Sequence, residues 1–217
     1  MHPPLPPRGL RERKRIETRQ RIADVATLLF LERGFDAVTV ADVAAAADVS
    51  KVTVFNYFPR KEDLLLDRMP EADILLTEAV ENRRPDQTPL AAVRELLVEL
   101  FRTGHPFAGI GPGREHFWRV VQESPTLRAR VREAVEELEA RLAALFLAAG
   151  GAVPGGADAR LAAALVVTAY RTVHAEGIRH QLSGIPSADL VDDHLARLED
   201  AFDRVERAVS GPQAGSF

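Results

Sequence analysis

The chain has 217 residues, a formal net charge of −4 and no cysteine. The lack of cysteine excludes a disulfide framework and thiol chemistry, and the length allows one large or two modest domains. With only 6% aromatic residues and many Ala, Leu, Arg and Glu, the composition favours an all-α protein. No secretory signal and no uncharged apolar run of the ~18–20 residues needed for a membrane span is visible. We therefore expect a soluble, cytoplasmic protein.

The charge is unevenly distributed along the chain. Residues 8–61 hold 11 Lys and Arg against 7 Asp and Glu, whereas the other residues hold 17 basic against 25 acidic side chains. A basic N-terminal part joined to an acidic body is the pattern expected of a nucleic-acid-binding module attached to another domain.

The first predicted helix follows a Pro-rich N-terminus and ends at Gly34, in the C-cap position that Gly favours. Its apolar face carries Ile22, Ala26, Leu29 and Phe30. The basic run at residues 11–15 has two interpretations. It is either a solvated charge run or an arm on the DNA backbone, which would add salt-dependent affinity without reading sequence.

Two short helices are predicted between residues 39 and 58. Thr39 is expected to cap the first, with Asp42 completing a variant of the capping box. Asp48 takes the turn, because Asp tolerates the left-handed backbone conformation better than most residues. Ser50 is expected to cap the second helix, which Pro59 ends. This arrangement is typical of a helix-turn-helix.

The second short helix has two chemically different faces. At about 100° per residue, Val54, Phe55 and Phe58 fall on one side and would hold the helix on a small core. The opposite side and its flanks carry Val52, Thr53, Asn56 and Tyr57. Asn can bond adenine, Thr or Val can contact a thymine methyl, and Lys or Tyr can bind phosphate. The alternative is an ordinary helical hairpin with a polar surface.

A set of residue types at fixed spacing extends without a gap from about Arg15 to Leu65. It comprises GFDAVTV at 34–40, Val49-Ser50, Thr53, Tyr57-Phe58 and KEDLL at 61–65. On these residues the chain resembles the DNA-binding domain of the TetR family of bacterial one-component transcriptional regulators. Two positions depart from the family pattern: Asp48 replaces a usual Gly, and Phe55 lacks the hydroxyl that relatives often offer to phosphate. The predicted DNA-binding residues are Thr39, Ser50, Lys51, Val52, Thr53, Asn56, Tyr57 and Lys61.

The predicted organisation has four segments. These are a disordered tail (1–10), a helix-turn-helix domain (11–60), a helical effector-binding and dimerisation domain (61–209) and a flexible tail (210–217). Lys61 is expected to open a fourth helix that Pro70 kinks or interrupts and that continues to about Arg83. Further helices are expected at about 89–104, 114–122, 125–149, 158–182 and 187–209, with a Gly- and Pro-rich loop at 150–156.

The last two predicted helices carry apolar stripes. They either close the core of their own protomer or pair with a second copy. Because one helix-turn-helix reads few bases, two-fold symmetry with half-sites about 34–36 Å apart would add selectivity. The resemblance implies a four-helix bundle between two copies, so we predict a homodimer on a palindrome-like operator. The predicted interface residues are Leu165, Ala169, Val173, Leu195, Leu198 and Phe202.

Aromatic and His residues of the body form a candidate ligand pocket. They are Leu97, Phe101, His105, Phe107, Phe117, Trp118, Val121, Tyr170 and His174. Each by default is a packing residue, but together they suit an apolar cavity with few polar anchors. The resemblance implies a small apolar effector that moves the fourth helix and releases a repressor from DNA. The alternative is a DNA-binding regulator or architectural protein with no small ligand, which a fully packed body would favour.

An enzyme is not expected. Glu176 and His180 can share a helix face, but the repeated Glu-x-x-His units of a metal-binding bundle are missing. There is no Gly-x-Ser-x-Gly, no phosphate-binding Gly loop and no nucleophilic Cys. We predict no catalytic residue, no metal and no cofactor.

Overall fold

The computed structural model of the chain describes residues 9–150 and 159–210, and every regular element within them is a helix. This confirms the all-α class. Backbone contacts divide the chain into two compact units, one reaching Asp67 and including residues 120–127, and one formed by residues 68–119 and 128 onward. The two predicted tails and the predicted loop at 150–156 lie almost entirely outside the described residues.

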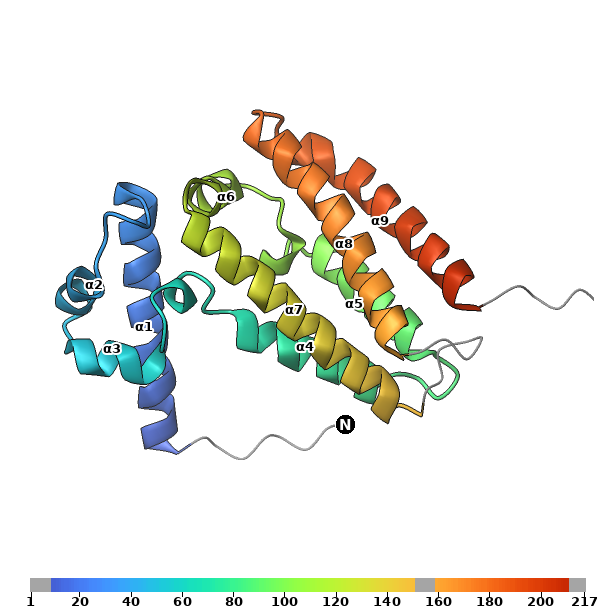
Figure 1. Cartoon of the computed structure of the whole chain (residues 1–217), viewed down its shortest axis with the longest axis horizontal. Helices are drawn as coiled ribbons and strands as arrows, with labels where there is room; N and C mark the ends of the chain where they lie inside the picture. Colours follow the sequence, from blue (N-terminus) through green and yellow to red (C-terminus); the bar gives the residue numbers. More distant parts are fainter. Residues whose placement is uncertain (1–8, 151–158, 211–217) are drawn as a thin grey trace, which may run out of the picture. The chain divides into compact units, whose positions relative to one another are not determined.

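The first unit contains three helices, α1 (Leu10–Arg33), α2 (Val40–Ala46) and α3 (Lys51–Tyr57), followed by the short 3-10 helix η1 (Glu62–Leu64) (Figure 1). Thr39 and Asp42 form the predicted capping box, and the Ser50 hydroxyl caps α3. Asp48 has a φ of 51°, so it takes the left-handed turn conformation as predicted. These local predictions are confirmed.

The core of the first unit draws side chains from every helix in it. Its fully buried members include Ile22, Phe30, Val43, Val54, Phe58 and Leu64. Leu127 is also fully buried, and the Ser124 hydroxyl donates to the Asp36 carboxylate at 3.1 Å. The Arg19 guanidinium donates to the Asp67 carbonyl at 2.8 Å. Residues 61–67 therefore belong with the first unit, whereas the sequence placed a domain boundary between residues 60 and 61.

The predicted fourth helix beginning at Lys61 is wrong in its first part. Residues 62–64 form η1, and α4 (Met69–Glu81) begins only at Met69, with Pro70 in its first turn. Proline fits the first turn of a helix, because the N–H groups there have no intrahelical partner. Pro70 therefore starts this helix and does not kink it, and the chain at residues 67 and 68, where it passes from the first unit to the second, is not helical.

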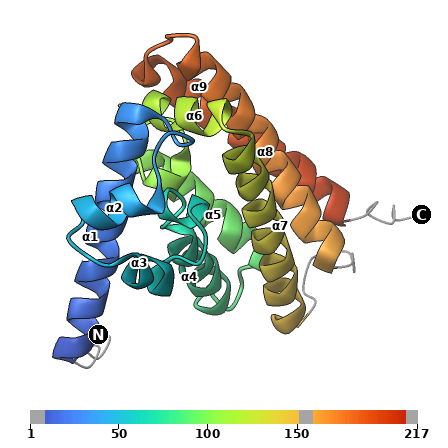
Figure 2. The same ribbon diagram turned by 60° about the vertical axis from the view of Figure 1, so that its left-hand side comes forward.

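The second unit contains α4, α5 (Pro89–Arg102), the 3-10 helix η2 (Pro106–Ala108), most of α6 (Arg114–Glu123) and α7 (Pro125–Ala148), then α8 (Ala159–Leu182) and α9 (Ser187–Ser210). From α5 onward the α-helical bounds agree with the predicted ranges to within about two residues. Helices α8 and α9 lie side by side in both views (Figures 1 and 2). Among the described residues, no helix combines the length and apolar character that crossing a bilayer requires.

The apolar stripe of α9 closes the core of its own protomer. Leu198 is 1% exposed and Phe202 is 0% exposed in the single chain, and both belong with Val173 to the main core cluster of the second unit. This burial contradicts the prediction that Leu198 and Phe202 face a partner subunit, because a side chain enclosed in its own chain has no surface left for a second copy. Val173 is 7% exposed and stays a predicted contact. Leu165, Ala169 and Leu195 are only partly buried against the same cluster.

Candidate nucleic-acid interface and effector site

Helix α3 separates a buried face from an exposed one. Val54 and Phe58 are each 1% exposed and anchor the helix on the core of the first unit, whereas Val52 is 69% exposed. Lys51 and Asn56 are exposed as well. Within the described part of the chain, the Asn56 amide makes no side-chain hydrogen bond. It can therefore bond an external group, such as a base edge.

Phe55 does not lie on the buried face, contrary to the prediction, since it is 50% exposed. It lies about 100° from Val54 around the helix axis, beyond the part of α3 that the core covers. The exposed surface of α3 therefore carries an aromatic ring near Val52. The angle of Phe55 around the helix already indicated that it could be exposed. The apolar character of Phe nevertheless favoured its assignment to the core.

The hydroxyl groups of Thr39, Ser50 and Thr53 are already engaged in helix capping. The Thr39 hydroxyl donates to the Asp42 carboxylate at 2.6 Å and accepts from the Asp42 N–H at 3.2 Å. This side-chain bond, followed by the bond from the Thr39 backbone, holds the pKa of the Asp42 carboxyl below its usual value. Ser50 accepts from the Thr53 N–H at 3.0 Å, and the two hydroxyls lie 2.8 Å apart. These bonds fix the N-terminal turns of α2 and α3.

Lys61 is held inside the first unit. Its ammonium group donates to the Phe35 carbonyl at 2.6 Å and lies 4.0 Å from the centre of the Phe35 ring. Burial lowers the pKa of this ammonium group. Lys61 is only partly buried and this bond uses one of its three N–H donors, so its predicted phosphate contact stays a prediction.

We expect Lys61→Met to lower the free energy of unfolding by about 1–3 kcal/mol, because the variant loses a charge-assisted hydrogen bond and a cation–π contact. Urea unfolding followed by circular dichroism measures the change. Lys51→Met is the matched control, because Lys51 is exposed on the same domain and should change stability by less than about 0.5 kcal/mol. Equal stabilities of the two variants would contradict this role of Lys61.

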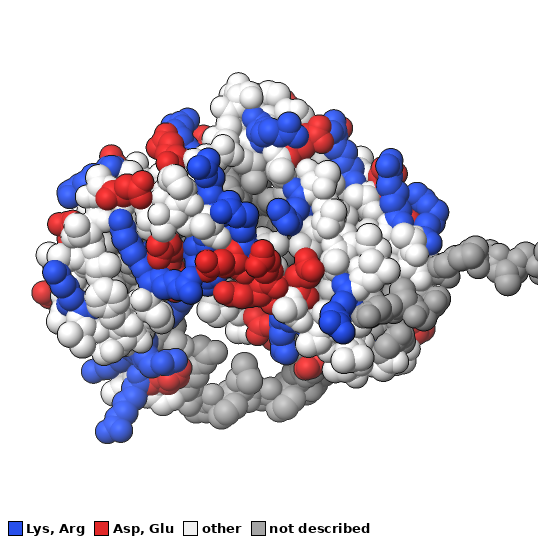
Figure 3. All heavy atoms as spheres, viewed as in Figure 1, with Lys and Arg blue, Asp and Glu red and all other residues white. Residues whose placement is uncertain are grey.

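The beginning of α1 presents a run of exposed cations. Arg11, Arg13, Lys14 and Arg15 are all exposed, and Lys and Arg side chains project from this region at the lower left of Figure 3. Arg15 also pairs with Glu12 at 3.6 Å. Exposed guanidinium and ammonium groups of this kind bind phosphate by charge, with an affinity that falls as salt rises.

In the second unit, ring contacts connect most of the predicted pocket residues. Tyr170 stacks on His174 with ring centres 4.5 Å apart, and Trp118 meets His174 edge-on at 6.4 Å. His194 joins this cluster, at 5.7 Å from His174 and stacked 4.3 Å from Phe101. His194 was not among the predicted pocket residues. Its position in the sequence, next to Leu195 and four residues before Leu198, does not indicate that its ring contacts Phe101 and His174.

The other predicted pocket residues lie in different parts of the chain's fold. His105 and Phe107 lie together, with ring centres 5.3 Å apart, and Phe117 meets Trp118 edge-on at 5.1 Å. Leu97 packs against the main core cluster of the second unit. Val121 belongs to the first unit and is buried there. The sequence therefore identified the members of an aromatic cluster but not its limits.

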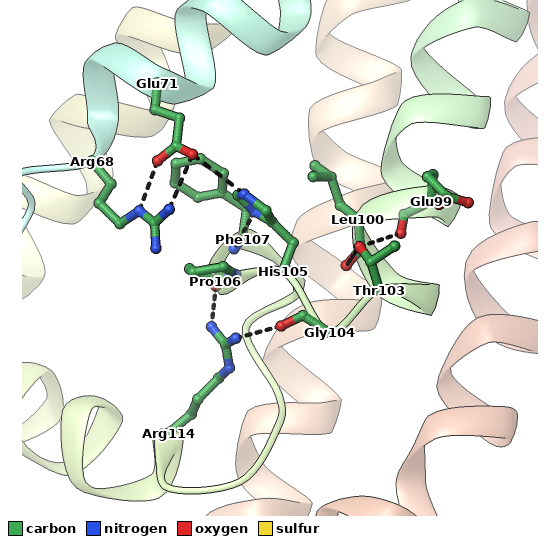
Figure 4. Close-up of polar contacts among 10 residues, drawn as sticks. All are labelled: Arg68, Glu71, Glu99, Leu100, Thr103, Gly104, His105, Pro106, Phe107 and Arg114. Carbon is green, nitrogen blue, oxygen red and sulfur yellow. Dashed lines mark hydrogen bonds and ion pairs between the residues drawn. The ribbon is translucent and has the colours of Figure 1, made fainter.

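The loop at residues 104–113, which includes η2, is bound through its backbone carbonyls by side chains of α6 and α8. The Arg114 guanidinium donates to the carbonyls of Gly104, at 2.8 Å, and of Pro106 (Figure 4). Further donors reach the same loop: the Trp118 indole binds the Gly109 carbonyl, the Tyr170 hydroxyl binds the Phe107 carbonyl, and the Gln181 amide binds the Gly111 carbonyl. The loop is thus fixed by four side chains.

Gly109 packs directly against the imidazole of His174. Gly109 has a φ of 71°, and a Cβ atom built on it would lie 1.6 Å from His174 Nε2. The His174 Nδ1 atom is buried and has no hydrogen-bond partner among the described residues. Burial, and then the nearby charges of His194 and Arg114, lower the pKa of His174 to about 3. Burial likewise lowers the pKa of His194 to about 4, so both rings are neutral at pH 7.

A charged cluster links the same loop to the first turn of α4. Glu71 binds the Arg68 guanidinium, with Oε2 2.7 Å from Nε, and its Oε1 lies 3.3 Å from His105 Nε2 (Figure 4). The hydrogen bond from Arg68 is the main reason why the pKa of the Glu71 carboxyl is lowered. His105 therefore connects the 104–113 loop to the helix that follows the junction between the units.

Comparisons with known proteins agree with this architecture. Residues 22–67 match the family model described as bacterial regulatory proteins, tetR family. The HTH-type transcriptional regulator TcmR of Streptomyces glaucescens is 32% identical over 146 residues, which cover 66% of this chain and 65% of TcmR. The match therefore spans slightly less than two thirds of that relative.

Two solved structures are similar in fold. SmeT, the repressor of the Stenotrophomonas maltophilia multidrug efflux pump SmeDEF, gives a TM-score of 0.60 at 18% identity in its triclosan complex, over 92% of this chain and 95% of SmeT. Thermus thermophilus FadR in complex with lauroyl-CoA gives 0.57 at 23% identity, over 91% of this chain and 100% of FadR. At these identities the likeness concerns the fold.

Proposed function

Because this chain belongs to the TetR family of transcriptional regulators, we propose that it represses transcription by binding a palindromic operator as a homodimer, and that a small-molecule effector releases it. The observation that carries the proposal is the exposed face of α3, where Val52 and Asn56 face away from the buried Val54 and Phe58. Regulators of this family are not enzymes, in agreement with the prediction that the chain has no catalytic site.

The proposed DNA interface divides into base-reading and phosphate-binding residues. Val52, Thr53 and Asn56 read base edges in the major groove, because they supply methyl groups and an amide on one face of α3. Thr39, Ser50, Lys51 and Tyr57 lie on α3 or at the starts of α2 and α3, and they bind the sugar-phosphate backbone. The exposed cations at the start of α1 add further charge. Lys61 supports the interface from within the domain.

The proposed dimer uses surfaces of α8 and α9 that the protomer core leaves open. Leu161 of α8 is 54% exposed, and Leu165, Ala169 and Leu195 are partly exposed. These residues, and not Leu198 or Phe202, are expected to contact the second copy. A two-fold dimer would present two recognition helices to half-sites about 34–36 Å apart.

The proposed effector binds among the aromatic residues of the second unit. Tyr170, His174, Trp118 and Phe107 combine apolar rings with few polar atoms, as small-molecule sites do. SmeT has been solved in complex with triclosan and Thermus thermophilus FadR in complex with lauroyl-CoA, so proteins of this fold bind small molecules. For release, the effector must favour the non-binding conformation by a few kcal/mol.

A specific observation supports a second candidate, a DNA-binding regulator without a small ligand. Gly109 fills the space against His174, and the 104–113 loop closes over the aromatic cluster. If the second unit has no room for a small ligand, DNA binding would be controlled by a protein partner, or the protein would have an architectural role on DNA. The two candidates differ in whether small molecules change operator affinity.

Selection of bound sequences from random duplex DNA, with purified protein at about 150 mM salt, tests the main proposal. A two-fold symmetric motif with half-sites about one helical turn apart is the expected result. Salt-sensitive binding without any recovered motif would contradict sequence-specific regulation and favour the architectural candidate. The recovered operator then serves as the probe for effector screening.

We expect Asn56→Ala to lose about 1–3 kcal/mol of discrimination at one base pair of each half-site, because the bidentate amide contact disappears. Binding of the variant to the operator and to single-base changes at constant salt measures the loss. Asn82→Ala, at the end of α4, is the matched control, because Asn82 is an exposed amide outside the recognition helix. Unchanged operator specificity of Asn56→Ala would show that the face of α3 is assigned wrongly.

A further inference from the structure

The side chains that bind the 104–113 loop share one chemical property. Arg114 and Trp118 have hydrogen-bond donors and no acceptors, and the Tyr170 hydroxyl uses its donor here. All three donate to carbonyl oxygens of residues 104, 106, 107 and 109. Four carbonyl oxygens of the 104–113 loop therefore accept the hydrogen bonds that these side chains of α6 and α8 donate. Any molecule that took the place of this loop would have to supply acceptors.

The charge at this position favours an anion. Within the described residues Arg114 donates only to backbone carbonyls, which are neutral. It is also the first residue of α6, where the helix dipole is positive. Burial, followed by the nearby Arg68 charge, lowers the pKa of Arg114. A partly buried guanidinium in these surroundings would be stabilised by an opposite charge.

Two carboxylates of the same region, those of Glu71 and Glu115, are already engaged. Glu71 binds Arg68 and lies beside His105. Glu115 follows Arg114 in sequence, but its carboxylate accepts from the Gln181 amide at 3.1 Å and lies 3.1 Å from His116 Nδ1. A bond to its own backbone N–H is the main reason why the pKa of Glu115 is lowered. Arg114 is therefore left with an unneutralised charge.

An apolar surface lies next to this charge. The Tyr170 ring stacks on His174, and Trp118 meets the same imidazole edge-on. The His174 Nδ1 atom is buried without a partner among the described residues, and Gly109 of the loop packs against the other side of that ring. A buried polar atom without a partner costs free energy, so a ligand that bonds it gains affinity.

We propose that the effector is an organic anion, with a carboxylate or sulfonate group on an aromatic body, which binds Arg114, Tyr170 and Trp118 in place of the carbonyl oxygens of the 104–113 loop. The loop acts as an internal substitute for the ligand in the free protein. This inference rests on the proposed effector control. It adds the chemical class of the effector and the residues that recognise it.

Displacement of the loop also gives a route to the DNA-binding unit. His105 lies in the loop, and its partner Glu71 lies in the first turn of α4, four residues beyond the junction at residues 67 and 68. When an anion displaces the loop, His105 leaves Glu71. The first turn of α4 then loses this contact to the loop and can shift, while the ion pair of Asp73 with Arg141 at 2.8 Å still holds α4 to α7.

Two fluorescent probes test the proposal, because they share one aromatic body and differ in charge. 1-Anilinonaphthalene-8-sulfonate carries a sulfonate, and N-phenyl-1-naphthylamine carries no charge. The full-length protein is expected to bind the sulfonate at least about tenfold more tightly. Arg114→Gln is expected to weaken sulfonate binding about tenfold to a hundredfold and to leave the neutral probe unchanged, because only the charge-assisted bonds are lost.

Arg102→Gln is the matched control, since Arg102 is an exposed arginine of α5 that pairs with Glu199 at 3.6 Å. It should bind both probes as the unmodified protein does. Because Arg114→Gln also removes two bonds to the loop, Tyr170→Phe serves as a second variant that keeps the ring and loses one donor. It is expected to weaken sulfonate binding several-fold, with the thermal midpoint recorded for each variant.

Unchanged sulfonate binding in both Arg114→Gln and Tyr170→Phe would overturn the proposal, and so would equal losses for the charged and the neutral probe. These measurements use no DNA, so their outcome does not depend on operator binding. A protein that binds the sulfonate selectively through Arg114 supports the anion site even if operator affinity stays constant. Operator affinity that does not change when the sulfonate binds would contradict effector control, but it would not contradict the anion-binding site.

Discussion

Replacement of Phe202 by Ala is expected to lower the free energy of unfolding by about 3–5 kcal/mol, the usual cost of truncating a fully buried aromatic side chain. Phe202 is 0% exposed and belongs to the main core cluster of the second unit with Leu198, Val166 and Phe146. The truncation would leave a cavity that this close-packed core can fill only in part. Urea unfolding at several protein concentrations measures the change.

Leu147→Ala is the control for this prediction, because Leu147 lies on α7, outside the proposed dimer surface, and is 70% exposed. It should change the stability of the protomer by less than about 0.5 kcal/mol. If Phe202 instead contacted a second copy, its truncation would weaken dimerisation and leave the unfolding of the isolated protomer unchanged. That outcome would restore the interface role that the sequence had predicted for Phe202.

Acidification from about pH 6.5 to about pH 4.5 is expected to destabilise the protein by roughly 5 kcal/mol through two buried imidazoles. The pKa of His174 is about 3 and that of His194 about 4 in the folded chain, against an ordinary value of 6.5. Below pH 6.5 the unfolded chain therefore binds protons that the folded chain does not. This contribution is complete above pH 6.5 and is lost as the pH falls toward 4.

The slope of the free energy of unfolding against pH shows whether the imidazoles of His174 and His194 cause the acid sensitivity. Two uncompensated protons correspond to about 2.7 kcal/mol per pH unit, and one to about half of that. His174→Asn and His194→Asn should each reduce the slope by about half, because each variant removes one titrating ring. Urea unfolding at pH steps between about 4.5 and 7.5 gives both slopes. An unaltered slope in both variants would assign the acid sensitivity to other groups.

The helix boundaries and the turn of the helix-turn-helix were predictable because their causes are local. The capping box of Thr39 and Asp42, the Ser50 cap and the left-handed Asp48 each depend on residues within about four positions. The same holds for Thr88-Pro89 and Ser124-Pro125, where a capping hydroxyl precedes a proline in the first turn of α5 and of α7. Pro70 shows the limit of such signals, because one proline fits either a helix start or a helix kink.

The exposure of the candidate site residues was predictable only where the repeat of a single helix decides which side each residue faces. The sequence of α3 by itself separates Asn56 from Val54 and Phe58, since the helical repeat fixes that angle. It does not say how far the neighbouring core extends, and for this reason Phe55 was assigned to the wrong face. Nor does the chain pattern indicate that the Lys61 ammonium group, predicted to bind phosphate, donates to the Phe35 carbonyl 26 residues away.

The sequence by itself therefore determined the all-α class, the two faces of the proposed recognition helix α3 and the aromatic residues of the second unit. The tertiary structure alone decided what each apolar or aromatic side chain packs against. It placed Leu198 and Phe202 in the protomer core, brought His194 to Phe101 and His174, and set the 104–113 loop on Arg114, Trp118 and Tyr170. The physical reason is that periodicity and capping act within one helix, whereas these contacts join residues far apart in the chain.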